Sequence, residues 1–214
     1  MNPFRSMLSF AFFFISLACN SESEIYSVDI REIQVLEAYQ PFLSQVNSHR
    51  DSNSISFVFA TDLHNQVYSE PYSYSNNIIG KIKRLVSSVN ELNQWLDLSC
   101  VIICGDYLWN TDKTTKDAAK EALQDFSGVI CGIKDLPVLC LKGNHDDNSI
   151  AGRGNTLTQD DLYELNGAYF EDSHIVKDKR NPKGYYGYFD YVPDKIRIIY
   201  LNSIDMPWIE KVKN

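Results

Sequence analysis

Three short groups of polar residues follow apolar stretches of this chain, and their side chains carry oxygen and nitrogen donors. The groups are Asp62-Leu63-His64, Gly105-Asp106 and Gly143-Asn144-His145-Asp146. The stretches before them, residues 55–61, 100–104 and 136–141, have the composition of buried strands. Because the carboxyl ends of parallel strands meet at one edge of a sheet, these groups predict a metal site at that edge.

The residue types in these groups suit two divalent cations. Asp62 and His64 are two residues apart, and on an extended exit from a strand both can turn toward one metal ion. Asp106 can bridge two ions that lie roughly 3.5–4 Å apart, and the Asn144 amide oxygen is a neutral ligand for the second ion. Mixed oxygen and nitrogen donors favour Mn, Fe or Zn over Ca or Mg.

His145 follows a predicted ligand directly, so its side chain projects in a different direction. It can protonate the leaving-group oxygen of a substrate as a general acid, with Asp146 placed to orient its ring. Taken singly, each polar group is more simply a turn or a surface feature. Their order behind three apolar strands favours a catalytic site.

The segments between these groups predict the elements that position them. The spacing of apolar residues predicts one helix from Asn76 or Asn77 to Leu96 and a second that opens at Thr114 or Thr115. Strands and helices then alternate through residues 55–141, which indicates a parallel sheet with crossover helices. A short helix follows from Thr158 to Leu165. Residues 184–191 and 195–201 form an antiparallel hairpin pattern.

The composition fits one folded domain of ordinary size. The chain has 214 residues, of which 44% are hydrophobic and 22% charged, so a packed core is expected. The formal net charge of -8 argues against a nucleic-acid backbone as a non-specific partner. Three of four internal cysteines lie in apolar runs, which favours buried free thiols over disulfides. The four are Cys100, Cys104, Cys131 and Cys140.

Residues 1–19 have the pattern of a secretory signal peptide. Arg5 precedes the apolar run 7–18, which is too short for a membrane-spanning helix of about 20 residues. Ser16-Leu17-Ala18-Cys19 resembles a bacterial lipobox, so we expect an exported lipoprotein anchored to the membrane through Cys19. Simple secretion and an uncleaved anchor are the alternatives. Residues 20–50 are expected to be a polar tether with a short helix or strand around 30–43.

Across residues 55–201 the ordered motifs Asp-x-His, Gly-Asp and Gly-Asn-His-Asp resemble those of the calcineurin-like metallophosphoesterase family. The resemblance implies that Asp62 and His64 bind the first metal, Asp106 bridges, Asn144 binds the second, and His145 and Asp146 form the catalytic pair. It also implies hydrolysis of phosphate mono- or diesters by a hydroxide that bridges two metals. The implied fold is an α/β four-layer αββα sandwich with two mixed sheets, over residues 51–214.

The chain departs from the family pattern at two places. Trp109 stands three positions after Asp106, where the family often has an acidic or amide residue, and Asn110 follows it. The family also has later histidine ligands, including a Gly-His-x-His motif, whereas the four histidines here are His49, His64, His145 and His174. A domain incomplete at its C-terminus is therefore expected, with His174 more simply a loop residue than a substitute ligand. A non-catalytic truncated remnant or binding module, and a nucleotidase-like or nuclease member, are alternative functions.

Overall fold

A parallel sheet forms the centre of the molecule. The computed structural model describes residues 35–49, 54–66, 78–167, 175–191 and 196–202. In the order β1-β3-β5, the sheet consists of Phe57–Ala60, Cys100–Cys104 and Val138–Leu141. Phe57 lies beside Cys100 and Val101 beside Val138, and all three strands run parallel. The predicted alternation of strands and helices is therefore confirmed for this sheet.

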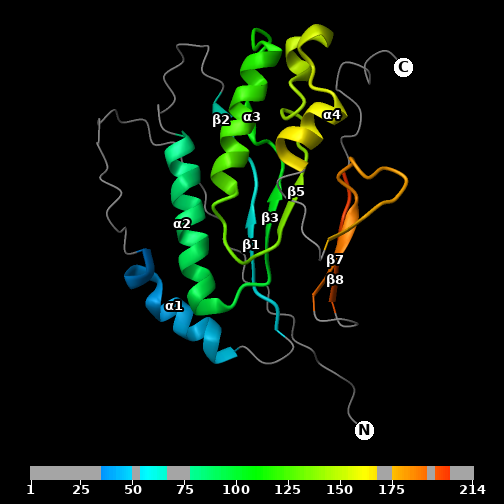
Figure 1. Ribbon diagram of the computed structural model, residues 1–214. Coiled ribbons are helices and arrows are strands. Elements are labelled where there is room, and N and C mark those ends of the chain that lie inside the picture. The colour runs from blue at the N-terminus through cyan, green and yellow to red at the C-terminus, as the bar shows by residue number, and fades with distance from the viewer. Residues whose placement is uncertain (1–34, 50–53, 67–77, 168–174, 192–195, 203–214) are drawn as a thin grey trace, which may run out of the picture.

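Helices cover one face of this sheet (Figure 1). They are α2 (Ile78–Leu96) and α3 (Lys116–Ile130), and α1 (Val35–His49) packs against α2. The side chain of Thr115 accepts a hydrogen bond from the Ala118 N–H, so Thr115 rather than Thr114 caps α3. The predicted end of α2 at Leu96 is confirmed, whereas its predicted caps, residues 76 and 77, lie outside the described part of the chain.

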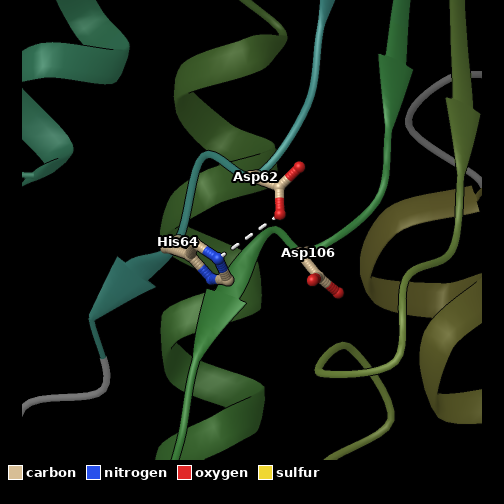
Figure 2. A group of neighbouring side chains, drawn as sticks. All are labelled: Asp62, His64 and Asp106. Carbon is tan, nitrogen blue, oxygen red and sulfur yellow. Dashed lines mark ion pairs between the residues drawn. The ribbon is translucent and has the colours of Figure 1, made fainter. Parts of the chain in front are cut away.

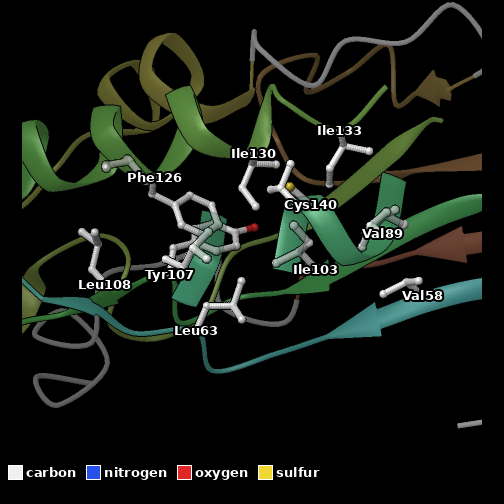
Figure 3. Packing of buried hydrophobic residues seen from close by; sticks show 14 of the residues in the cluster. Val58, Leu63, Val89, Ile103, Tyr107, Leu108, Phe126, Ile130, Ile133 and Cys140 are labelled. Atoms are coloured by element: carbon white, nitrogen blue, oxygen red, sulfur yellow. The ribbon is translucent and has the colours of Figure 1, made fainter. Parts of the chain in front are cut away.

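The main hydrophobic core lies between these helices and the sheet. Figure 3 shows side chains from α2, α3 and all three parallel strands in one cluster. Examples are Val89, Phe126, Ile130, Ile103 and Cys140. In both α2 and α3 the buried residues recur at intervals of three and four, so one stripe of each helix faces the sheet.

A second, antiparallel sheet packs against the other face of the first. It consists of β6 (Ile175–Lys177), β7 (Gly187–Tyr191) and β8 (Ile196–Tyr200), in that order. Phe189 and Tyr200 form a smaller core with Cys100 and Leu139 of the parallel sheet. The α/β class and the two stacked sheets are confirmed. Each sheet, within the described residues, is wholly parallel or wholly antiparallel rather than mixed.

Several short elements complete the described structure. The polar strand ends continue into a two-stranded parallel pair, β2 (Asn65–Gln66) and β4 (Leu108–Trp109), which the sequence did not predict; nor did it predict β6. Two 3-10 turns, Ser149–Ala151 and Arg153–Asn155, follow β5. Helix α4 (Gln159–Leu162) starts after Thr158 as predicted and continues as the π-helical turn Tyr163–Gly167.

Some expectations need correction or fall outside the described residues. The four internal cysteines are free thiols as predicted, but Cys131 is exposed because it lies just past the end of α3. Residues 1–19, most of the tether, His174 and the connection at residues 192–195 of the predicted hairpin lie outside the described ranges. Within those ranges, no helix combines the length and hydrophobicity needed to cross a bilayer.

Candidate metal centre

The loops after β1 and β3 run side by side at the carboxyl edge of the sheet. The Asp62 N–H donates to the Gly105 carbonyl at 3.2 Å, and the His64 N–H to the Asp106 carbonyl at 2.9 Å. Asp62, His64 and Asp106 all have left-handed backbone, with φ of 56°, 47° and 50°. The predicted extended exit from β1 is therefore wrong. Each such residue costs about 1 kcal/mol or more, and this kind of strain clusters at functional sites.

The side chains of these three residues converge. Figure 2 shows the two carboxylates and the imidazole facing a common space, from the β1 and β3 loops. One donor atom of each residue lies within 4.8 Å of the other two, and His64 Nε2 is 3.7 Å from Asp62 Oδ1. The Asp62 side chain is exposed, which leaves the group accessible from solvent. The donor set and its spacing fit a divalent metal ion of the Mn, Fe or Zn type.

The imidazole of His64 is held in the tautomer that a metal ligand needs. His64 Nδ1 lies 3.1 Å from the Leu108 carbonyl oxygen. Since a carbonyl oxygen only accepts, Nδ1 carries the proton and donates it. The lone pair is then on Nε2, the atom that faces Asp62. A backbone carbonyl commonly fixes metal-binding histidines in this way.

Close packing of two glycines brings the loop after β5 against Asp106. A Cβ atom on Gly143 would overlap the Asp106 carboxylate and backbone nitrogen, and one on Gly105 would overlap the Gly143 backbone. Gly105 also has a φ of +72°, which favours glycine. The His145 N–H donates to Asp106 Oδ1 at 3.1 Å and so fixes that carboxylate. Asn144 lies on the same loop with an exposed side chain, and its predicted role as second-metal ligand stays a prediction.

Asp146 is fully buried and binds backbone, not the His145 ring. Its carboxylate accepts hydrogen bonds from four N–H groups at 2.6–3.2 Å: those of Gly143, Asp106, Tyr107 and Leu108. Burial raises the pKa of Asp146 to about 7; the backbone donor of Gly143 opposes the rise and the nearby Asp106 charge adds to it. The expectation that Asp146 orients His145 is therefore wrong. Asp146 instead ties the β3 and β5 loops together.

Asn110 holds the His145 imidazole. The Asn110 amide nitrogen donates to the His145 carbonyl at 2.7 Å and to Asn148 Oδ1 at 2.9 Å, so its oxygen is the atom 2.8 Å from His145 Nδ1. That oxygen only accepts, which puts the ring proton on Nδ1 and leaves Nε2 as the free nitrogen. Asn148 is itself buried and anchored to the Thr114 and Asn155 carbonyls. The sequence places Asn110 beside Trp109 but carries no spacing signal for this role.

Trp109 completes an aromatic cluster with the two histidines. Its ring lies nearly parallel to that of His145, with centroids 5.6 Å apart and planes at 17°. His64 meets the other two rings edge-on, with centroids 5.1 Å from Trp109 and 5.4 Å from His145. The predicted general acid therefore lies directly beside the candidate metal ligands.

A cluster of metal-binding donors at the carboxyl edge of a layered α/β sheet is the arrangement expected of a metal-dependent enzyme. The sequence model of the calcineurin-like phosphoesterase family matches residues 55–210, so the chain belongs to that family. A comparison with curated proteins found no match. The match confirms the resemblance inferred from the three motifs, and the family suggests metal-dependent phosphoester hydrolysis as the class of reaction.

Proposed function

We propose that this protein hydrolyses phosphate mono- or diesters at the edge where the β1, β3 and β5 loops meet. The observation that carries the proposal is the convergence of Asp62, His64 and Asp106 donor atoms within 4.8 Å, beside a histidine whose Nε2 is free. Together with Asn144, these residues would hold two divalent cations. When bound, the cations would supply Lewis-acid activation of water and of the phosphate oxygens.

The protein side chains supply the proton, fix the tautomer of a metal ligand and hold the loops in place. In its imidazolium form, with both ring nitrogens protonated, His145 would give the Nε2 proton to the leaving-group oxygen and keep its Nδ1–H bonded to Asn110. The His64 tautomer is fixed by the Leu108 carbonyl. Asp146 keeps the β3 and β5 loops in register through four backbone N–H groups. It thus supports the donor geometry without touching the substrate.

The test is hydrolysis of p-nitrophenyl phosphate and bis-p-nitrophenyl phosphate with Mn, Fe or Zn. We expect activity that a chelator removes, and a loss of about 100-fold or more in Asp106→Asn because a charged metal ligand is lost. Asp125→Asn, an exposed carboxylate on α3, is the matched control and should retain full activity. Hydrolysis that persists in Asp106→Asn would contradict the proposal.

Calorimetric titration with Mn separates the catalytic proposal from the alternative of a non-catalytic binding module. Metal binding that requires Asp106, without turnover of either ester, would favour the binding module. Loss of both binding and turnover in Asp106→Asn supports the hydrolase.

We further propose that the protein is exported and lipidated at Cys19. Support comes from the charged start, the apolar run and the small residue before Cys19 in residues 1–19. Labelled fatty acid should enter the wild-type protein and be absent from Cys19→Ala. Label retained on Cys19→Ala would exclude the anchor.

A further inference from the structure

Trp109 is a rigidly held aromatic side chain that is half exposed at the candidate site. Its side chain is 49% exposed, while its neighbour Leu108 is fully buried. Because residues alternate across a strand, the pairing of β4 with β2 turns Leu108 inward and Trp109 outward. The β2 strand is anchored in turn, since the Asn65 amide nitrogen donates to the Ala122 carbonyl of α3 at 2.9 Å. An aromatic side chain held this firmly loses little entropy on contact with a ligand.

His145 stacks on one face of the Trp109 indole, with nearly parallel planes, and 49% of the residue is exposed. The three centroids form an almost equilateral triangle of 5.1, 5.4 and 5.6 Å, so His64 lies near the edge of the indole, not over its second face. The printed ring contacts of Trp109 within the described residues leave the face directed away from His145 without a ring partner, and we assign the exposed surface to that face.

We propose that this open face is a stacking platform for a planar base of the substrate, which makes nucleotides the preferred esters. The inference rests on the proposed function and names its substrate class. Aromatic rings stack with centroids roughly 4.5–7 Å apart, so a base on the free face lies about 10 Å from the His145 ring. A simple aryl phosphate cannot span that distance while its ester oxygen meets His145 Nε2. A nucleoside 5′-phosphate can, because a sugar separates its base from the phosphate.

The test compares two esters that differ only in the base: adenosine 5′-monophosphate and methyl ribofuranoside 5-phosphate. Base–aromatic stacking predicts a kcat/KM about tenfold higher for the nucleotide in the wild-type protein. Trp109→Leu should bring this ratio close to one, and Trp109→Phe should keep most of it. Trp95→Leu is the matched control, because Trp95 on α2 is also 49% exposed, and its ratio should equal the wild-type value.

A ratio of the two kcat/KM values near one in the wild-type protein would contradict the proposed stacking platform. So would a Trp109→Leu variant in which kcat falls equally for both esters and the ratio is unchanged, since Trp109 would then act only by positioning His145. If neither ester is hydrolysed, the proposed function fails. The stacking platform is then tested separately, by measuring how tightly each ester binds. Calorimetry with the Mn-loaded protein should then show about tenfold tighter binding of the nucleotide, lost in Trp109→Leu; equal affinities would overturn it.

Discussion

The imidazole of His145 is held by a neutral carboxamide, although an aspartate follows it in the sequence. Asn110 uses both ends of its side-chain amide: the oxygen accepts from His145 Nδ1, and the nitrogen donates to the His145 carbonyl and to Asn148. One side chain thus fixes both the ring and the backbone carbonyl of His145. Asn110 is buried, so this arrangement excludes water from Nδ1.

Asn110→Ala should reduce catalysis by freeing the His145 ring. We expect kcat to fall about 10- to 100-fold with little change in KM, because an orienting partner is lost but no substrate contact. The fall should be larger for phenyl phosphate than for p-nitrophenyl phosphate, since a poor leaving group depends more on the proton from Nε2.

Gln124→Ala removes an exposed carboxamide from α3 and serves as the control. An equal loss for both esters in Asn110→Ala would mean that Asn110 acts only on stability.

At the scale of elements, α4 is attached to α3 by the carboxylate of Asp161. Asp161 and Thr158 form a capping box at the start of α4. The Asp161 carboxylate also pairs with Lys116 and Lys120 of α3, at 2.8 and 2.6 Å. Burial alone would raise the pKa of Asp161, but the bonds from Lys116, Lys120 and Thr158 outweigh it and lower the pKa well below the usual range.

Asp161→Asn should lower the free energy of unfolding by about 1–2 kcal/mol at pH 7. A carboxylate whose pKa is lower in the folded state contributes stability above its unfolded pKa of about 4 and loses it as the pH falls further. The difference between wild type and Asp161→Asn should therefore shrink below pH 4. Urea unfolding across pH 2–7 measures it.

The adjacent Asp160→Asn is the control, because Asp160 makes an exposed pair with Lys183 and should change stability by under about 0.5 kcal/mol. A difference at Asp161 that stays constant down to pH 2 would contradict the role of its charge.

At the scale of the whole molecule, two hydrophobic clusters of the described residues join the helices, the parallel sheet and the antiparallel sheet. The larger joins the helices to the parallel sheet, and the smaller joins the parallel sheet to the antiparallel one. In the described part of the chain, Val176 and Ile199 are exposed apolar residues of the antiparallel sheet, and Leu201, just past the end of β8, is exposed as well. The attachment of this sheet therefore depends on its inner face.

Phe189→Ala should destabilise the molecule by about 3–5 kcal/mol, because it removes a large side chain that is 4% exposed between the sheets. Ile199→Ala, on the outer face where the side chain is 66% exposed, is the matched change and should cost under about 1 kcal/mol. Urea unfolding gives both values. Similar losses for the two variants would mean that the sheets are not held together by this cluster.

The sequence by itself determined the main strands and helices and the protein family. Alternation of apolar strands with amphipathic helices predicted β1, β3, β5, α2 and α3, and the short motifs identified the calcineurin-like phosphoesterases. Threonine caps and the hairpin were also readable, because caps, turns and apolar periodicity depend on neighbours within a few residues.

Only the tertiary structure decided which hydrogen-bond partners each polar side chain has, and therefore which role each one can take. Asp146 binds four N–H groups, three of them about forty positions away in the chain, while Asn110 takes the orienting role that the sequence assigned to Asp146. The left-handed backbone at Asp62 and His64, and the stacking of Trp109 on His145, follow from loops packed against one another. Burial and hydrogen-bond partners at such a junction depend on distant segments, so local patterns do not encode them.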